Sequence, residues 1–316
     1  MQHNQLGKTD LSVSAVSLGT APLGDMFGAA DESDAIGAVY RALDAGINFF
    51  DSSPYYGAGL AERRLGSALR GRRGQVVIGT KAGRYGRDEF DFSPRRLRES
   101  LHRSLELLQT DYVDILQLHD VEFVGLDGVF ADSYAELVRL RKEGKCRYIG
   151  MTGYPIETLS RAVTETDLDV VLSYAHYTLL NTRLAGELAP LCAKRGVGLI
   201  NAAAVALGLL TPAGPRIQLP AGERIVQAAR RARDVCRERG ADIAFLANQF
   251  SIQRSGAATT VVGTTKIKHL EAAVAAEAAP IDEDLLAAVL AATADVRSLS
   301  WSSGLPDNNG GDTCSA

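Results

Sequence analysis

Short apolar runs alternate with amphipathic stretches along almost the whole chain. The apolar runs are rich in Val, Ile and Leu and end at glycine or a polar residue, which is typical of buried strands. Between them, apolar side chains such as Ile36, Val39 and Leu43 recur at helical spacing. This pattern predicts strands at 15–19, 47–50, 76–80, 113–118, 146–151, 169–173, 197–201 and 259–262. It predicts helices at 31–45, 62–69, 93–109, 134–142, 156–163, 184–194, 242–251 and from 268 onwards.

A parallel α/β architecture follows from this alternation. We predict a (β/α)8 TIM barrel rather than an open doubly wound sheet, because the connections are short and no G-x-G-x-x-G follows the first strand. Residues 6–13 predict an N-terminal hairpin that caps the barrel, and 223–239 and 283–295 predict extra helices towards the C-terminus. Since no linker-like composition interrupts the chain, we expect one domain over 1–316 whose last residues, about 304–316, form a flexible tail.

Charge and composition narrow the range of partners. The net charge is −4 without a basic stripe, which argues against binding to nucleic acid or to anionic membranes. The N-terminus lacks a signal-peptide pattern, and no apolar run approaches the length of a membrane span. The 4 cysteines lie far apart without C-x-x-C spacing, which is typical of reduced thiols. We expect a cytoplasmic protein, a monomer or small homo-oligomer, that acts on a small molecule.

Ionisable side chains follow three successive predicted strands. The strand at 47–50 is followed by Asp51 and, after a Ser-Ser-Pro turn, by Tyr56. The next strand runs into Lys81, and the one after it ends at His119. In a parallel barrel the carboxyl ends of all strands meet at one face. A lone lysine there is usually solvated and a lone histidine structural, but the combination predicts a catalytic site.

This set of side chains suits proton exchange at a substrate oxygen. A free tyrosine has a pKa of about 10, too high for a base near neutrality, and a nearby ammonium favours its phenolate. Lys81, paired with Asp51, would supply that charge to Tyr56, while His119 would orient the substrate oxygen. We expect no metal, because there is no H-E-x-x-H and one histidine with one aspartate is a poor ligand set.

The sequence around these positions resembles the aldo-keto reductase family. Asp51 with Tyr56, Lys81 in G-T-K and His119 in L-Q-L-H-D match the order and spacing of that family's catalytic tetrad. The segments N-F-F-D-S-S-P-Y-Y-G, E-G-K-C-R-Y-I-G-M-T-G-Y-P and S-W-S-S-G are most similar to the L-galactose dehydrogenase branch, followed by the L-fucose (D-threo-aldose) 1-dehydrogenases. The resemblance implies an NAD(P)-dependent oxidoreductase on a (β/α)8 barrel, with Tyr56 as proton donor or acceptor.

The same resemblance implies which residues contact the cofactor and the substrate. The expected cofactor residues lie at strand ends, in the loop after 197–201 and in the turn before the helix at 268: Gly19, Thr20, Thr152, Gly153, Ser173, Tyr174, Asn201, Ala202, Leu207, Gly208, Gly263, Thr264, Thr265, Lys266 and His269. The expected substrate residues are Tyr55, His119, Asp120, His176 and Trp301. As alternatives, His176 is a structural histidine and Trp301 a packing anchor.

This chain departs from the family pattern around the cofactor. The aromatic residue that many members stack on nicotinamide falls near Ala202, and the adenine contact falls near Ala273. No arginine stands in the last turn and helix, so Lys266, Lys268 and His269 are the only cations there for a 2′-phosphate. We therefore expect NAD as the cofactor, with NADP as the alternative.

Three functions are compatible with these residues. The first is an aldose 1-dehydrogenase that oxidises the anomeric carbon of L-galactose, L-fucose or a related sugar to its lactone. The second is an NADPH-dependent aldehyde or ketone reductase of a biosynthetic pathway, which uses the same residues in the opposite direction. The third is a non-catalytic regulatory subunit, for which the chain shows no partner-binding extension.

Overall fold

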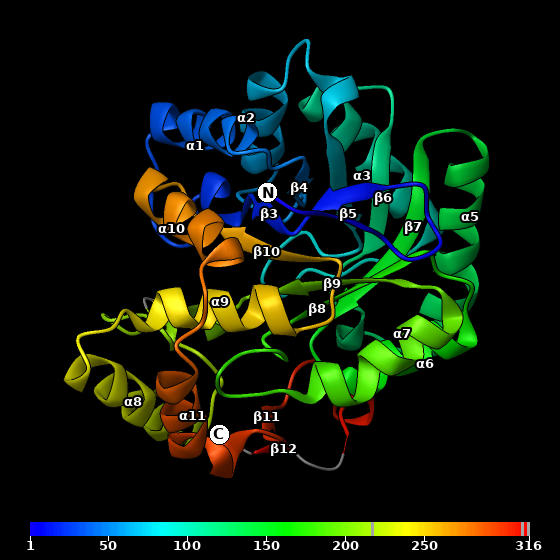
Figure 1. The fold of residues 1–316 in the computed structure, drawn as a ribbon. Coiled ribbons are helices and arrows are strands. Elements are labelled where there is room, and N and C mark those ends of the chain that lie inside the picture. Colours follow the sequence, from blue (N-terminus) through cyan, green and yellow to red (C-terminus); the bar gives the residue numbers. More distant parts are fainter. Residues whose placement is uncertain (216–217, 311–312, 315–316) are drawn as a thin grey trace.

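Parallel strands hydrogen-bond in a ring and close a barrel in the computed structural model, which describes residues 1–215, 218–310 and 313–314 (Figure 1). In order around the described barrel, the strands are β10 (Thr259–Gly263), β3 (Val16–Gly19), β4 (Phe49–Asp51), β5 (Val77–Ala82), β6 (Val113–Leu118), β7 (Cys146–Gly153), β8 (Val170–Tyr174) and β9 (Gly198–Ala202). The (β/α)8 barrel predicted from the alternation is confirmed.

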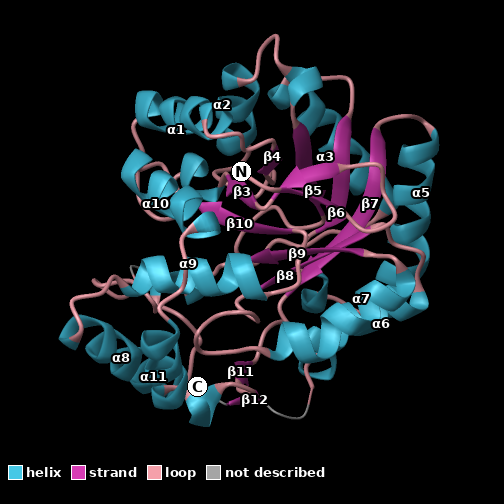
Figure 2. Ribbon diagram, viewed as in Figure 1, coloured by secondary structure: helices cyan, strands magenta, loops and turns pink. Residues whose placement is uncertain are grey.

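Helices surround this barrel, with strands inside and helices outside (Figure 2). The helices that connect successive barrel strands are α1 (Glu32–Asp44), α2 (Leu60–Ala68), α3 (Pro94–Leu108), α5 (Tyr134–Lys142), α6 (Ile156–Glu165), α7 (Ala189–Arg195) and α9 (Ile243–Arg254). The short helix α4 (Leu126–Gly128) precedes α5, and α10 (Ile267–Ala278) follows the last barrel strand. The extra helices α8 (Glu223–Glu238) and α11 (Glu283–Ala292) pack on each other beside α9.

Local sequence explains how these helices begin and which face they bury. In α3, the Ser93 side chain accepts a hydrogen bond from the N–H of Arg96, and Pro94 occupies the first turn, where its missing N–H is harmless. The buried side of α3 carries Leu97, Leu101 and Leu105. The helix predicted at 184–194 instead opens with a wide turn, Leu184–Leu188, before α7. Pro190 lies at the junction and has no N–H to continue regular helical bonding.

The N-terminal hairpin closes the floor of the barrel. Its strands are β1 (His3–Gln5) and β2 (Ser12–Ser14), so the prediction at 6–13 covered the connecting loop more than the strands. At the two ends of that loop, Leu6 and Leu11 are buried in the same cluster as Phe49 of β4. The backbone of Gly7 lies against the start of β9, which places the hairpin at the amino ends of the strands. The opposite end, where the strands finish, is therefore where a site can open.

The C-terminal segment folds back onto the barrel mouth. Strand β11 (Ser300–Trp301) pairs with β12 (Thr313–Cys314), and the Asn308 side chain donates hydrogen bonds to the carbonyls of Glu122 and Val124 at 2.8 and 2.9 Å. The flexibility predicted for about 304–316 remains a prediction, as does the single domain over 1–316. Residues 311–312 and 315–316 lie outside the described part. None of the helices described here is long and apolar enough to cross a bilayer.

Two glycines allow the loops that carry Tyr56 to pack closely. A Cβ added at Gly24 would lie 2.4 Å from the Tyr56 carbonyl oxygen, and one added at Gly57 would lie 2.4 Å from the Gly24 oxygen. Gly57 also has a φ of +65°, which side chains rarely adopt. The position of Tyr56 thus depends on a backbone-to-backbone contact that only glycine permits.

Gly24→Ala is expected to lower the free energy of unfolding by about 1–3 kcal/mol, because the added methyl group forces two backbone segments apart. Urea denaturation checks this. The control is Gly37→Ala in α1, where an added Cβ meets nothing within 4 Å and helix propensity should raise stability by roughly 0.5–1 kcal/mol. A Gly24→Ala protein as stable as the wild type would contradict the close packing.

Candidate active site

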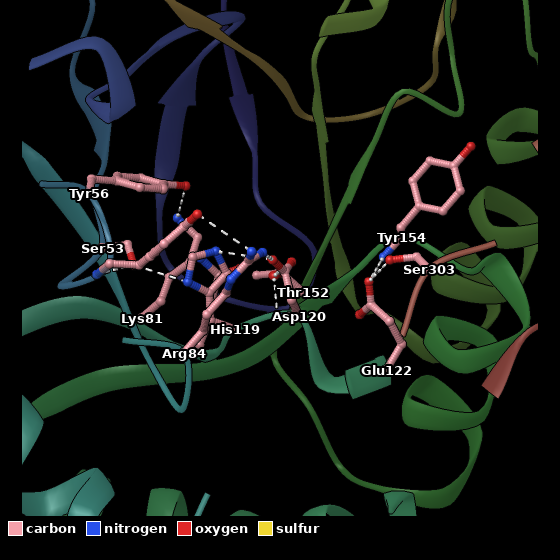
Figure 3. Close-up of polar contacts among 12 residues, drawn as sticks. Ser53, Tyr56, Lys81, Arg84, His119, Asp120, Glu122, Thr152, Tyr154 and Ser303 are labelled. Carbon is pink, nitrogen blue, oxygen red and sulfur yellow. Dashed lines mark hydrogen bonds and ion pairs between the residues drawn. The ribbon is translucent and has the colours of Figure 1, made fainter. Parts of the chain in front are cut away.

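The side chains predicted from the strand ends lie together at the carboxyl end of the barrel: Figure 3 shows Tyr56, Lys81 and His119, and Asp51 is bonded to Lys81. Asp51 is the last residue of β4 and Lys81 lies in β5, so both belong to the strands rather than follow them. His119 comes directly after β6, and Tyr56 lies in the turn after β4. Asp51, Lys81 and His119 are buried. Neighbouring strands in register bring these residues together across the barrel mouth.

The Lys81 ammonium is the hub of this cluster. It donates to Asp51 Oδ2 at 2.6 Å, to the Ser52 carbonyl at 2.8 Å and to the Tyr56 hydroxyl oxygen at 3.3 Å. An ammonium has three N–H donors, so these partners use all of them. The Tyr56 oxygen accepts from Lys81, which leaves its own proton free to point away from the lysine, towards a substrate.

Burial and charge oppose each other at this hub. Burial alone would lower the pKa of Lys81, but the Asp51 carboxylate and Tyr56 outweigh it, so the net pKa is raised and the lysine stays charged. Burial raises the pKa of Tyr56 to about 12, against the positive charge of Lys81, which lowers it. Lys81 therefore lowers the pKa of Tyr56, as expected, but this effect is smaller than the increase that burial causes. At neutral pH Tyr56 holds its proton.

His119 is neutral and has one free edge. Burial lowers its pKa to about 3. Its Nδ1 lies 3.0 Å from the Ser53 hydroxyl, whose oxygen also accepts the Tyr55 N–H at 3.1 Å. Ser53 can therefore donate its proton to Nδ1, which leaves the ring proton on Nε2. A substrate oxygen between Nε2 and Tyr56 would then face two hydrogen-bond donors.

A second ion pair, between Arg84 and Asp120, adjoins the cluster. Of its two residues, sequence reasoning found only Asp120. Arg84 bonds through Nη1 to the Asp120 carboxylate, and its guanidinium carbon lies 4.3 Å above the Tyr55 ring. Asp120 and Tyr55 were expected here, whereas Arg84 was missed. Its signal was present in the sequence, because it follows Lys81 closely at the same strand end. Gln117, two residues before His119, was also missed and donates to Asp51 at 3.4 Å.

The other expected substrate residues lie in a separate cluster around Tyr154. The Trp301 ring stacks on Tyr154 with centroids 4.4 Å apart, and His176 lies 4.5 Å from the same ring. His176 is fully buried and bonds to Ser173 and Ser300, which is the pattern of a structural histidine. Figure 3 shows Tyr154 set apart from Tyr56 and Lys81. Substrate contact by His176 and Trp301 stays a prediction.

Glu122 joins this second cluster to the C-terminal segment, and sequence reasoning did not find it. It is fully buried, accepts hydrogen bonds from the Ser303 hydroxyl at 2.9 Å and the Tyr154 N–H at 3.1 Å, and its Oε2 has no partner. Burial, with a smaller contribution from the Asp120 charge, raises its pKa to about 8. A contact between residues so far apart in the chain leaves no local signal.

The expected cofactor residues fall into three groups. Those whose backbone or side chain lies at the barrel mouth are Gly19, Thr20, Thr152, Gly153, Tyr174, Ala202 and Gly263. Those in the loop after β9 or at the start of α10 are Leu207, Gly208, Thr264, Thr265, Lys266 and His269. Ser173 and Asn201 lie near the ends of β8 and β9 and have partners within the protein: the Ser173 hydroxyl lies 3.4 Å from His176 Nδ1, and the Asn201 amide donates to the Thr260 hydroxyl at 3.4 Å. Their contact with the cofactor stays a prediction.

The first turn of α10 is able to hold an anion. No side chain caps this helix, as in α2 and α5 to α8, and the Thr264 hydroxyl accepts the N–H of Lys266 just before it at 3.0 Å. Uncapped N–H groups at a helix start suit a phosphate, as a dinucleotide carries. Gly19 and Gly263 are paired across neighbouring strands next to this turn. The residues present therefore fit a dinucleotide cofactor. Among the described residues, no cluster of His, Cys, Asp and Glu could hold a metal.

Comparison with known proteins decides the family. The model of the aldo/keto reductase family matches residues 15–293. The chain belongs to the aldo/keto reductase family. It is 40% identical to the L-galactose dehydrogenase of Arabidopsis thaliana over 96% of this chain and 98% of that protein. It is 32% identical to the D-threo-aldose 1-dehydrogenase of a Pseudomonas species over 82% of this chain and 88% of that protein.

Solved structures agree with this assignment. An aldo-keto reductase from Bacillus halodurans, in its holo form, superposes with a TM-score of 0.76 at 28% identity and covers 92% of this chain and 96% of its own. This aldo/keto reductase is an NAD(P)-dependent oxidoreductase that acts on a small molecule. The resemblance read from the sequence is thus confirmed at the level of family, fold and enzyme class.

The buried carboxyl group of Glu122 predicts a pH-dependent stability. Its pKa is about 8 in the folded protein against an ordinary 4.5, so the folded state holds a proton that the unfolded state has lost. Its stabilising contribution is complete below pH 4.5 and is lost as the pH rises towards 8. In Glu122→Gln the side chain cannot ionise, so the stability that the wild type loses as the pH rises is kept. At alkaline pH the variant should be more stable than the wild type by up to a few kcal/mol.

Thermal unfolding of both proteins from pH 5 to pH 9 measures the difference. Glu99→Gln on α3, where the side chain is half exposed, is the control and should follow the wild type. Parallel curves for Glu122→Gln and the wild type would show that Glu122 does not hold a proton in the folded protein.

Proposed function

We propose that this aldo/keto reductase is an aldose 1-dehydrogenase. It oxidises the anomeric carbon of L-galactose, L-fucose or a related cyclic sugar to the lactone, with NAD as the hydride acceptor. The observation that carries the proposal is the position of Tyr56, whose oxygen lies 3.3 Å from the Lys81 ammonium and whose ring meets the His119 ring edge-on. The similarity over almost the full length to an L-galactose dehydrogenase supports the sugar.

In this proposal, the chain's own residues place and deprotonate the anomeric hydroxyl. Nε2 of neutral His119 donates to the anomeric oxygen and fixes its position. Tyr56 takes the proton of that hydroxyl, and the charge of Lys81 stabilises the phenolate from which it acts. Asp51, at 2.6 Å from Lys81, holds the ammonium in place. Acceptance of the hydride from the same carbon is the chemistry that a bound nicotinamide would supply.

The polar surroundings of the phosphate turn favour NAD over NADP. The Lys266 ammonium, expected to meet a 2′-phosphate, forms an ion pair with Asp34 of α1 at 2.9 Å. Its charge is already compensated, and a 2′-phosphate would approach the Asp34 carboxylate. The cofactor would be held by Gly19, Thr152, Gly153 and the first turn of α10, with small residues such as Ala202 at the mouth.

One observation favours the carbonyl reductase instead. The pKa of Tyr56 is raised to about 12, so its hydroxyl is protonated at neutral pH and ready to donate to a carbonyl oxygen. Oxidation of a sugar needs the reverse transfer, which mildly alkaline conditions favour. The reaction direction therefore has to be measured with both kinds of substrate.

The test is the appearance or loss of reduced nicotinamide. The purified protein is given NAD or NADP with L-galactose, L-fucose and a panel of other aldoses at mildly alkaline pH, and NADPH with simple aldehydes near neutrality. Strong reduction of NAD by one or two sugars is the expected result. If the protein reacts with no sugar and oxidises NADPH rapidly in the presence of aldehydes, the proposal is wrong and the protein is a carbonyl reductase.

Removal of the Tyr56 hydroxyl should stop proton exchange without disturbing the barrel. Tyr56→Phe is expected to lower kcat by about 10²–10⁴-fold, the usual contribution of general acid–base catalysis, while the NAD dissociation constant stays within about threefold. Steady-state kinetics and NAD titration check both. Tyr55→Phe removes the neighbouring hydroxyl and should keep kcat within about tenfold. Turnover near the wild-type value in Tyr56→Phe would exclude Tyr56 as the proton acceptor.

Asp34 offers a test of the cofactor preference. Asp34→Asn removes the carboxylate beside Lys266 and should lower the KM for NADP by about threefold to fivefold, since exposed ion pairs are worth up to about 1 kcal/mol. The KM for NAD should hardly change. Asp44→Asn, at the other end of α1, removes the same charge far from the turn and serves as control. Equal effects of the two variants would mean that Asp34 does not face the cofactor.

A further inference from the structure

A buried ion pair stands beside the proposed catalytic cluster without a role in the proton transfer. Arg84 lies in the loop after β5 and Asp120 directly follows His119. Their side chains are bonded to each other and only 15% and 6% exposed. A buried ion pair is a weak source of stability, because both charges lose their hydration. Stability alone therefore does not explain why this pair is placed at the barrel mouth.

Asp120 is held in a strained position next to the free edge of His119. Its Oδ2 lies 3.7 Å from Nε2 of His119, too far for a hydrogen bond between them. Its backbone has a φ of +52°, and its N–H and carboxylate bond to the Thr152 hydroxyl at 3.1 and 3.3 Å. Strain of this kind is concentrated at functional sites. A substrate oxygen on Nε2 would have this carboxylate as its next polar neighbour.

Arg84 is fixed by aromatic rings on several sides. Its guanidinium carbon lies 4.3 Å from the centre of the Tyr55 ring and 5.3 Å from those of Phe90 and Phe123, which stack on each other. The guanidinium has five N–H donors in a rigid plane. Nη1 donates to Asp120, Nε donates to the Gly86 carbonyl at 3.3 Å, and Nη2 donates to the Arg87 carbonyl at 3.4 Å and the Tyr55 hydroxyl at 3.5 Å. Among the described residues, this leaves the second N–H of Nη1, next to Asp120, for a ligand. A hydroxyl group can donate to such a carboxylate and accept from such a guanidinium at the same time.

We propose that Arg84 and Asp120 determine specificity by binding the hydroxyl group on the carbon next to the reacting carbon. This inference rests on the proposed function: when the anomeric oxygen lies on Tyr56 and His119, the C2 hydroxyl comes beside Asp120. The carboxylate accepts its proton, and Arg84 donates to its oxygen. Because the two charges compensate each other, the subsite suits a neutral sugar rather than an anion.

The substrates that test this differ by single hydroxyl groups. Wild-type protein is assayed with NAD and L-galactose, 2-deoxy-L-galactose or L-fucose, which lacks the hydroxyl on C6; if another aldose of the panel is preferred, its own 2-deoxy analogue is used. We expect kcat/KM to fall by about 100-fold or more for the 2-deoxy sugar, since a site built for a hydroxyl rejects the analogue without it. L-fucose should stay within about tenfold.

Two variants separate recognition from folding. In the double variant Arg84→Leu with Asp120→Asn, no charge is left unpaired, and asparagine tolerates the positive φ of position 120. It should lose about 100-fold in kcat/KM for the 2-hydroxy sugar yet oxidise the 2-deoxy sugar within about threefold of the wild type. Asp120→Asn alone, which keeps the size of the side chain, should also lower the ratio of kcat/KM for the 2-hydroxy sugar to kcat/KM for the 2-deoxy sugar. Asp169→Asn, which breaks a part-buried pair with Arg141 before β8, is the control and should leave the ratio unchanged.

The outcomes distinguish this inference from the proposed function. Wild-type protein that oxidises L-galactose and its 2-deoxy analogue equally well overturns the subsite and leaves the dehydrogenase intact. Variants that lose both substrates to the same degree give Arg84 and Asp120 a merely structural role, which also overturns it. Protein that oxidises no aldose removes the proposed function and the subsite together.

Discussion

The ion pair between Asp51 and Lys81 is the constraint on which the rest of the site depends. Both groups are buried at the barrel mouth, where each alone would be costly in free energy. Together with the Ser52 carbonyl and Tyr56, the carboxylate satisfies every donor of the ammonium. Two neighbouring strands supply the pair, so its geometry is set by the barrel's hydrogen-bonded register rather than by a mobile loop. The direction of the Tyr56 proton follows from it.

Much of the fold and of the central cluster could be predicted from local sequence. The alternating strands and helices are visible as periodic patterns, and a buried strand that ends in Asp51, Lys81 or His119 is informative because apolar runs rarely carry such groups. The predicted hairpin began three residues late and ended one residue early, since Leu6 and Leu11 look like strand residues but pack at the barrel floor. The turn at Leu184–Leu188 was missed because Pro190 acts on hydrogen bonding rather than on periodicity.

What local sequence could not give is long-range contact and the balance of opposing effects. Arg84 reads as one of many loop arginines until the barrel brings it to Asp120. Glu122 reads as an exposed acid, and only the return of Ser303 and Asn308 buries it. The effect of Lys81 on Tyr56 could be assigned a sign from charge, but burial is larger, and burial is a property of the assembled mouth. The cofactor residues share this limit: Ser173 and Asn201 lie near the ends of their strands, but local sequence gave no sign of their partners His176 and Thr260.

Deuterium on the anomeric carbon of the sugar gives the most direct measurement of the central claim. L-galactose labelled at C1 is incubated with NAD and the protein, and the reduced nicotinamide and the sugar product are analysed by mass spectrometry. If the anomeric carbon loses a hydride as Tyr56 takes the proton of its hydroxyl, the deuterium appears in the reduced nicotinamide and the sugar becomes a lactone. Reduced nicotinamide without deuterium, or a labelled sugar recovered unchanged, would contradict oxidation at C1.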